Sequence, residues 1–232
     1  MKLYIGNKNY SSWSMRPWVL MTDAGIPFEE VKIRFDAFTP GSDFKQRIGA
    51  VSPTGKVPAL VDGDLVVWDT LAIAEYLAEW QARAHPDRAP LWPAAIPARA
   101  RARSLCAEMH SGFTALRSHC PMNIEASLPE VGARVLAEQP GVKADLSRLC
   151  AAWGDCLQDF GGPWLGGAAF SVIDAFFAPV VMRMRTYGLP LPAEIAAYAA
   201  RLVARPSVAA WMADALAERD FLDFEEPYRR SA

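Results

Sequence analysis

A stretch rich in proline lies in the middle of the chain and limits how the rest can fold. Residues 81–97, QARAHPDRAPLWPAAIP, hold prolines at positions 86, 90, 93 and 97. Each proline removes one backbone hydrogen-bond donor and biases the residue before it toward extended geometry. A continuous helix does not accommodate that pattern, so the stretch is predicted as a linker. It divides the 232 residues into two predicted domains, 1–80 and 98–232.

Before the linker, short strand-like runs are mixed with helical ones. Apolar periodicity and β-branched residues predict strands in KLYI (2–5), FEEVKIRF (28–35), PALV (58–61) and LVVW (65–68). Asp62-Gly63 favours a tight hairpin turn between the third and fourth runs, because glycine readily takes a positive φ. Helical patterns cover 15–24, closed by Gly25, and 70–80. The predicted order is β-α-β-(α)-β-β-α, which describes an α/β domain.

After the linker, the apolar residues follow helical spacing only. Helices are predicted near 98–119, 130–138, 143–160, 192–204 and 207–218. Ser171 and Asp174 have the spacing of a capping box ahead of the apolar run AFFAPVVM, which predicts a further helix start. The second domain is therefore predicted to be all-α.

Composition and charge exclude several classes of protein. Half of the residues are apolar (52%), which excludes disorder as the main state. Lys+Arg 24 against Asp+Glu 26 gives a net charge of -2, so the basic excess typical of nucleic-acid binders is absent. The opening MKLYIGNKNY is too short and polar for a signal peptide, and no apolar run is long enough to span a membrane. We therefore expect a cytoplasmic protein that binds neither nucleic acid nor membrane.

The four cysteines, at positions 106, 120, 150 and 156, show no close-spaced pair, so we expect reduced thiols and no disulfide framework. Cys106 and His110 have helical i, i+4 spacing, which two metal ligands can also have. No further ligand motif accompanies them, so a packed helix face is the favoured interpretation. We expect no metal.

Candidate chemistry begins directly after the first predicted strand, in NKNYSSWS. Ser11, Ser12 and Ser14 cluster where a helix is expected to start. A serine there can simply cap the helix by accepting from its free N–H groups. The same helix end carries partial positive charge, so a serine hydroxyl there can also donate to a bound thiolate and favour its ionised form. Both interpretations fit the sequence.

Two further pairs of residues suit a ligand that carries a peptide backbone. A proline that opens a strand, as in Val57-Pro58, is often cis, and that geometry would offer the Val57 N–H and C=O to an extended peptide. An ordinary proline on an edge strand is the alternative. Asp69-Thr70 precedes the helical run LAIAEYL, where Asp69 suits a ligand ammonium and Thr70 suits a cap. Plain capping is again the alternative.

In combination, these features resemble the glutathione transferase superfamily over nearly the whole chain. The resemblance implies a thioredoxin-like N-terminal domain joined to an all-helical C-terminal domain. The SSWS segment is most similar to the serine-type branches, and to the zeta class in particular. Trp13 stands where the zeta Ser-Ser-Cys motif has its cysteine, which argues against cysteine-dependent deglutathionylation.

The resemblance also implies roles for single residues. Ser11 would donate to the glutathione sulfur, because its distance from Arg16 matches the zeta and tau pattern, whereas the delta and theta pattern selects Ser12. The Val57 backbone would pair with the cysteinyl part of glutathione. Asp69 and Thr70 would hold the γ-glutamyl end, and Lys56 would meet the glycyl carboxylate.

The implied function is that of a glutathione transferase, with glutathione as co-substrate and a small hydrophobic electrophile as second substrate. That electrophile would bind between the domains, near EMHSGF (108–113), Trp13 and Phe38. A homodimer is implied as well. One alternative is a glutathione-dependent isomerase of a maleyl compound that uses Arg99 or Arg103. The other is a non-catalytic glutathione-binding or interaction protein of the same fold.

Overall fold

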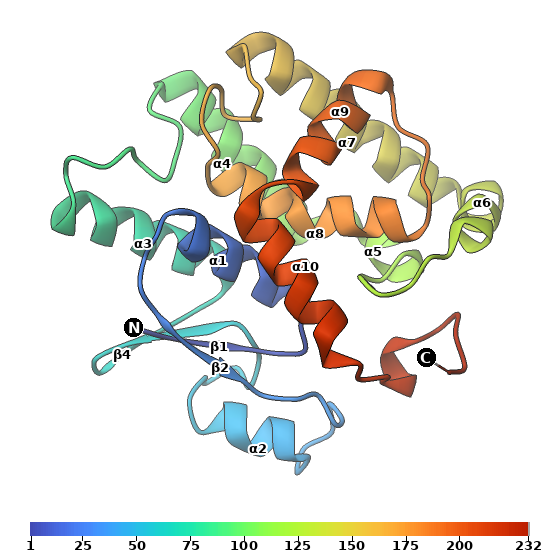
Figure 1. The fold of residues 1–232 in the computed structure, drawn as a ribbon, viewed down its shortest axis with the longest axis horizontal. Coiled ribbons are helices and arrows are strands. Elements are labelled where there is room, and N and C mark those ends of the chain that lie inside the picture. Colours follow the sequence, from blue (N-terminus) through green and yellow to red (C-terminus); the bar gives the residue numbers. More distant parts are fainter. Residues whose placement is uncertain (232) are drawn as a thin grey trace.

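The computed structural model describes residues 1–231 and begins with a four-stranded sheet in the order β2-β1-β3-β4 (Figure 1). The strands are β1 (Lys2–Ile5), β2 (Glu29–Lys32), β3 (Ala59–Asp62) and β4 (Leu65–Trp68). β1 pairs parallel with β2 and antiparallel with β3, and β3 and β4 form an antiparallel hairpin. All four predicted strands are present, although β2 is shorter than the run 28–35.

The hairpin turn lies one residue later than predicted. Asp62 pairs with Leu65 as the last rung of the ladder, so Gly63 and Asp64 form the turn. Gly63 has φ +58°, which glycine adopts without the steric penalty that a side chain brings. The glycine, and not Asp62, therefore opens the turn.

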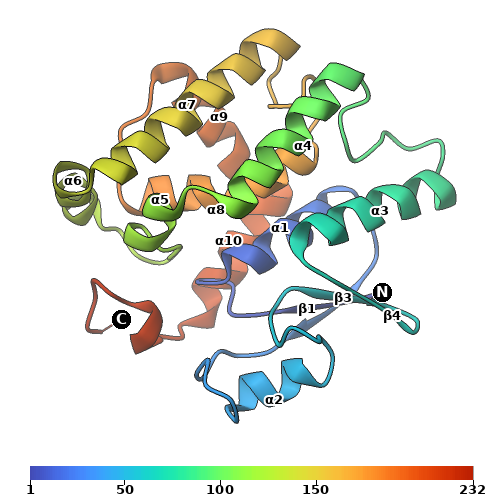
Figure 2. The same ribbon diagram turned by 180° about the vertical axis from the view of Figure 1, so that it is seen from behind.

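Three helices accompany the sheet: α1 (Ser12–Asp23), α2 (Asp43–Gly49) and α3 (Thr70–Ala84). α1 and α3 cover one side of the sheet and α2 lies on the other (Figures 1 and 2). α1 starts earlier than predicted, directly after Ser11. α3 continues past residue 80 into the stretch expected as a linker, because its first proline, Pro86, lies beyond the end of the helix.

The rest of the described chain is helical. It contains α4 (Ile96–Ser111), α5 (Thr114–His119), α6 (Pro129–Glu138), α7 (Pro140–Phe160), α8 (Val172–Thr186), α9 (Ala193–Val203), α10 (Pro206–Glu218) and the short 3-10 helix η1 (Asp223–Glu225). Up to residue 231 the β pairing in this part is a single bridge between Trp164 and Gly167. The prediction of an α/β part followed by an all-α part is confirmed. No helix in residues 1–231 is both long and apolar enough to cross a membrane.

The prediction of a single helix at 98–119 was wrong, because two helices occupy this range. α4 ends at Ser111, and Phe113 takes the left-handed conformation (φ +53°) before α5 begins. A side chain at Gly112 would meet the Glu108 carbonyl oxygen at 2.8 Å. The missing Cβ therefore lets the chain turn at the end of α4, before α5 begins.

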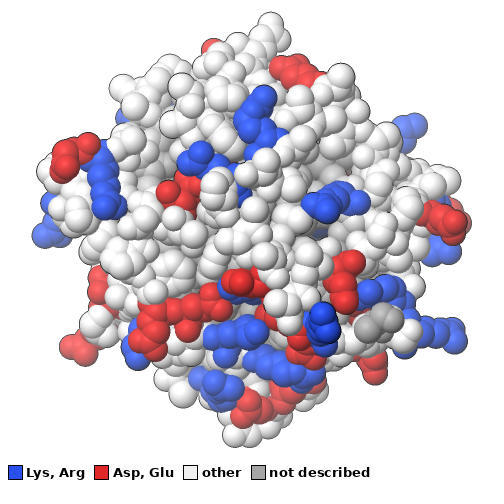
Figure 3. Space-filling view, in the orientation of Figure 1, with Lys and Arg blue, Asp and Glu red and all other residues white. Residues whose placement is uncertain are grey.

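Charged side chains of both signs are mixed over the lower part of the face in Figure 3, where the sheet and α2 lie in Figure 1. Ion pairs join β2 and its following loop to the end of α10. Lys32 pairs with Glu218 at 3.0 Å, and Arg34 pairs with Asp220 at 2.6 Å. These contacts tie the sheet to the last long helix.

α8 is the central helix, and all its residues except Arg185 are buried. It begins at the predicted capping box. The Asp174 carboxylate accepts from the backbone N–H groups of Ser171 and Leu165, both at 3.0 Å, and from the Tyr198 hydroxyl at 3.1 Å. One buried carboxylate thus connects the start of α8, the loop before it and α9.

Replacing Asp174 with alanine should lower the free energy of unfolding by about 3 kcal/mol or more, because three buried donors lose their acceptor. Urea denaturation measures this change. Asp159→Ala, at an exposed carboxylate 3.9 Å from Arg101, is the control and should change stability by less than about 0.5 kcal/mol. Equal effects of the two substitutions would contradict the assigned role of Asp174.

Candidate functional site

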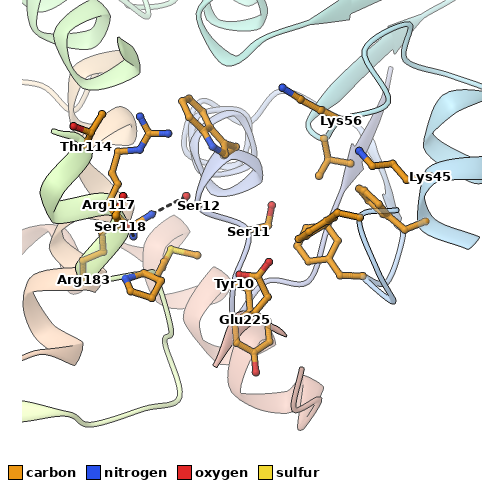
Figure 4. Close-up of a pocket in the computed structure, with 17 residues that line it drawn as sticks. Tyr10, Ser11, Ser12, Lys45, Lys56, Thr114, Arg117, Ser118, Arg183 and Glu225 are labelled. Atoms are coloured by element: carbon orange, nitrogen blue, oxygen red, sulfur yellow. Dashed lines mark hydrogen bonds between the residues drawn. The ribbon is translucent and has the colours of Figure 1, made fainter. Parts of the chain in front are cut away.

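The start of α1 opens onto a cavity of about 620 Å³ between the sheet and the helical part. Ser11 is the N-cap residue of α1 and Ser12 is its first residue, and both line the cavity. In Figure 4 these serines lie near the centre, with Arg117 and Arg183 on one side and Lys45 and Lys56 on the other. Unpaired N–H groups at a helix start favour negative charge nearby, so the position suits an anion.

Neither serine side chain caps α1. The Ser11 hydroxyl donates instead to Ser14 Oγ at 2.7 Å, and Ser14 Oγ also accepts from the Gly6 backbone N–H at 3.2 Å. Ser12 Oγ accepts from Arg183 Nη2 at 3.1 Å. Capping alone therefore does not account for the two serines.

A second cavity, of about 390 Å³, adjoins the first and shares four lining residues with it, namely Trp13, Lys56, Val57 and Arg117. Asp69 and Thr70 line only this second cavity. The candidate site residues from the sequence thus line two adjoining cavities. They are Ser11, Ser12, Lys56, Val57, Asp69 and Thr70.

The Val57-Pro58 peptide bond is cis, as predicted. Among residues 1–231, neither the backbone N–H nor the backbone C=O of Val57 has a hydrogen-bond partner. Val57 lines both cavities, at the point where β3 is about to begin. Its backbone groups are therefore free to pair with an extended ligand.

Asp69 and Thr70 differ in how their side chains are used. Asp69 has φ +78° and caps α3, since its Oδ1 accepts from the Leu71 N–H at 2.9 Å. Asp69 is thus the residue that caps this helix. The Thr70 hydroxyl is buried and has no hydrogen-bond partner within the described chain. A buried hydroxyl without a partner is unfavourable unless a ligand satisfies it.

His110 reaches this site from α4, a contact that the sequence did not reveal. Its Nε2 lies 3.2 Å from Asp69 Oδ2, and its ring packs edge-on against Trp13 with centroids 5.1 Å apart. The sequence placed His110 beside Cys106, which is fully buried, and within the segment 108–113 expected near the second substrate, but not beside Asp69. Local spacing carries no signal of a contact between α4 and the start of α3. Residues 1–231 contain no cluster of three His, Cys, Asp or Glu side chains suited to a metal.

The arginines and the segment expected near the second substrate lie elsewhere. Arg103 pairs with Glu75 at 2.9 Å on the surface, and Arg99 donates to the Pro93 and Ala94 carbonyls. Neither lines the two cavities, and from 108–113 only His110 does. The break before α5 explains the difference, because it brings Thr114, Arg117 and Ser118 to the first cavity instead. Trp13 and Phe38 line it as expected.

Glu225, from η1, is a further cavity residue that the sequence did not suggest. Burial raises the pKa of its carboxyl to about 7, with Arg183 acting in the opposite direction. The unfolded carboxyl has an ordinary pKa of 4.5. The folded state therefore favours the protonated form across the interval between these two values.

Glu225 should make stability depend on pH. Because its pKa is raised on folding, its contribution is fully present below about pH 4.5 and is lost as pH rises through about 7. Thermal unfolding across this range should show wild type losing stability relative to Glu225→Gln. Asp223→Asn, at an exposed carboxylate in the same turn, is the control and should follow wild type. Parallel profiles for wild type and Glu225→Gln would contradict the raised pKa.

Comparisons with known proteins agree with this geometry. The family model for the N-terminal domain of glutathione S-transferases matches residues 10–80, and that for the C-terminal domain matches residues 70–214. A zeta-class glutathione S-transferase from Euphorbia esula is 28% identical over 173 residues, 74% of this chain and 71% of that protein. Glutathione S-transferase theta-3 from Mus musculus is 30% identical over 194 residues, 81% of this chain and 70% of that protein.

Solved structures share the whole architecture. A glutathione transferase homolog from Burkholderia with bound glutathione superposes with a TM-score of 0.69 at 26% identity, over 92% of this chain and 97% of that chain. The C-terminal family model alone spans residues 70–214 of the 232, which is more than half of the sequence. The chain therefore belongs to the glutathione transferase superfamily.

Proposed function

We propose that this protein is a glutathione transferase that binds glutathione as co-substrate and activates its thiol for attack on a small electrophile. One observation carries the proposal. The start of α1, with Ser11 and Ser12, opens on a cavity beside the unpaired backbone groups of Val57 and the unpaired Thr70 hydroxyl. These are the groups that a short anionic peptide can satisfy.

Glutathione presents an ammonium, two carboxylates, a peptide backbone and a thiol, and the cleft has a partner for each. We assign the ammonium of the γ-glutamyl end to Asp69 and its carboxylate to Thr70 Oγ1 and the start of α3. The Val57 N–H and C=O pair with the cysteinyl residue, as in the addition of a strand. Lys56, exposed at the rim, meets the glycyl carboxylate.

The thiol then lies at the start of α1. There a serine hydroxyl and the helix N-terminus stabilise the thiolate and lower the thiol pKa below its ordinary value of about 8.5. The proton leaves to solvent. The sulfur lone pair forms a bond to the electrophilic carbon, and the leaving group departs with its electron pair. Proximity of the two bound substrates supplies much of the acceleration.

We assign the donor role to Ser11, with Ser12 as the alternative. For Ser11 to act, its hydroxyl must exchange its bond to Ser14 for one to sulfur. Ser12 accepts from Arg183, which leaves its own hydrogen for a ligand. Ser11 would therefore have to break a hydrogen bond within the protein to act as the donor, whereas Ser12 would not. Replacing each serine in turn shows which one acts.

The isomerase alternative finds less support than the transferase. An isomerase that uses Arg99 or Arg103 lacks its proposed contact, because neither arginine lines the cavities. A non-catalytic glutathione-binding protein remains an outcome of the thiol titration below. Assembly as a homodimer and a cytoplasmic location are further proposals, and both rest on the family resemblance and composition.

Ser11→Ala should raise the pKa of the bound glutathione thiol toward its free value and slow conjugation by about 10²-fold, while glutathione affinity is nearly kept. Ultraviolet difference titration of the thiolate in wild type, Ser11→Ala and Ser12→Ala measures the pKa. The same effect from Ser12→Ala alone would transfer the role to Ser12. An unshifted thiol pKa in wild type would favour the non-catalytic alternative.

Thr70→Val should weaken glutathione binding by about fivefold to tenfold, because the ligand carboxylate loses one hydrogen bond. The free energy of unfolding should not fall, since the Thr70 hydroxyl has no partner to lose within residues 1–231. Calorimetric binding and urea denaturation measure the two effects. Thr39→Val, at an exposed threonine outside both cavities, is the control. Unchanged affinity in Thr70→Val would remove Thr70 from the site.

A further inference from the structure

Three arginines gather beside the serines at the start of α1. The guanidinium carbons of Arg16 and Arg117 lie 4.3 and 4.9 Å from the centroid of the Trp13 ring. Arg183 donates to Ser12 at 3.1 Å, a bond drawn in Figure 4. Arg117 and Arg183 line the first cavity, and Arg16 lies behind Trp13 in the buried face of α1.

No carboxylate in residues 1–231 lies within 4.0 Å of these three guanidinium groups. Backbone carbonyls are their acceptors instead. Arg16 donates to the Phe176 carbonyl at 3.2 Å and Arg183 donates to the Cys120 carbonyl at 2.7 Å. Some arginines elsewhere do have a carboxylate partner, as Arg103 has Glu75 and Arg205 has Asp23. Within the described part of the chain, none of the three guanidinium groups is therefore ion-paired.

This clustering is unfavourable for the protein alone. Burial, together with the neighbouring guanidinium groups, lowers the pKa of Arg16 to about 9 and that of Arg183 to about 10. Desolvated charges of one sign destabilise one another unless a counter-charge joins them. A bound anion would supply that counter-charge.

The whole cavity has an excess of positive charge. Lys45, Lys56, Arg117 and Arg183 line it, against one carboxyl, that of Glu225. The lysines lie on the side of the serines that we assigned to the glycyl end of glutathione, and the arginines lie on the other side (Figure 4). Arg183 lines only the first cavity, whereas Arg117 lines both cavities. The arginine side of the first cavity is left for the second substrate.

Arg117 has the free donors on that side. Its Nη1 makes only two long contacts, at 3.4 Å each, to the carbonyls of His110 and Gly112. Its Nε and Nη2 donate to no other group of the described chain, and the side chain is half-buried. The Nη groups of Arg183 already donate to backbone carbonyls and to Ser12 Oγ. Arg117 can therefore bind an anion directly, while Arg183 adds charge.

The first cavity also has apolar lining. Phe35, Phe38 and Phe44 cluster beside Lys45, whereas Trp13 packs against Arg117. An apolar body fits against the Trp13 ring, and an anionic group fits against the arginines. Guanidinium groups match the two oxygens of a carboxylate in geometry as well as charge.

We infer that the second substrate is a small electrophile with an apolar body and a carboxylate, and that Arg117 binds the carboxylate in the field of Arg183. The inference rests on the proposed transferase function, because it concerns the second substrate of that reaction. It narrows the expected class from hydrophobic electrophiles in general to those that carry a negative charge.

A matched pair of unreactive ligands tests this site. 3,5-Dinitrobenzoate and its uncharged amide, 3,5-dinitrobenzamide, have nearly the same shape and no leaving group. Calorimetry would measure their affinities for wild type, with and without saturating glutathione. The variants are Arg117→Gln, which removes the charge, and Arg117→Lys, which keeps it. Arg103→Gln, at a paired surface arginine outside the cavity, is the control.

Wild type and Arg103→Gln should bind the benzoate about tenfold or more tightly than the amide. Arg117→Gln should bring the two affinities close together by weakening the benzoate alone, and Arg117→Lys should restore part of the preference. Equal affinities in wild type, or a preference that survives Arg117→Gln, would overturn the inference. Circular dichroism on each variant verifies that the fold is kept.

The outcome is separate from that of the proposed function. The thiol titration tests activation of glutathione, whereas this measurement needs no reaction and includes a series without glutathione. One possible result is that the benzoate preference depends on Arg117 while the pKa of the glutathione thiol is unshifted. This result would refute the transferase function and, with it, the inference that the second substrate carries a carboxylate. A shifted thiol pKa without that preference would overturn only the inference about the carboxylate.

Discussion

The packing of α1 against α8 is the contact on which the rest of the structure depends. α1 covers the sheet on one side and meets the buried α8 on the other, so one helix belongs to both parts of the chain. Arg16 reaches across this contact to the Phe176 carbonyl. Because α1 is held from both sides, its N-terminal serines face the cavity between the sheet and the helices. The position of the site follows from that packing.

The same contact explains why buried arginines are tolerated near the serines. Arg183 donates to the Cys120 carbonyl at the end of α5, and Arg16 donates to the Phe176 carbonyl within α8. These hydrogen bonds satisfy some of the donors, although Arg16 Nη1 has no partner within residues 1–231, and they do not neutralise the charge. The resulting field favours any anion bound at the start of α1, a thiolate and a carboxylate alike. Thiol activation and selection of the second substrate would thus share one electrostatic cause.

Most of the architecture could be predicted because it is encoded locally. Apolar periodicity and β-branched residues in KLYI and LVVW predicted β1 and β4, and the pair Ser171 and Asp174 predicted the start of α8. The errors arose where tertiary contacts override local preference. The break at Gly112 splits one predicted helix in two, and the close approach of the Glu108 carbonyl becomes visible only in the folded chain.

The candidate site, like the fold, has a part that local sequence predicts and a part that depends on tertiary packing. The sequence by itself identified part of the lining of the proposed glutathione cleft. Short motifs at helix starts and before a strand contain six of the lining residues, namely Ser11, Ser12, Lys56, Val57, Asp69 and Thr70. Only the tertiary structure decided what surrounds them. Arg117, Arg183, Glu225 and His110 come from α5, α8, η1 and α4, and long-range packing brings them to the cleft. Motif spacing reports on neighbours along a helix or strand, whereas contacts between distant elements depend on how those elements pack.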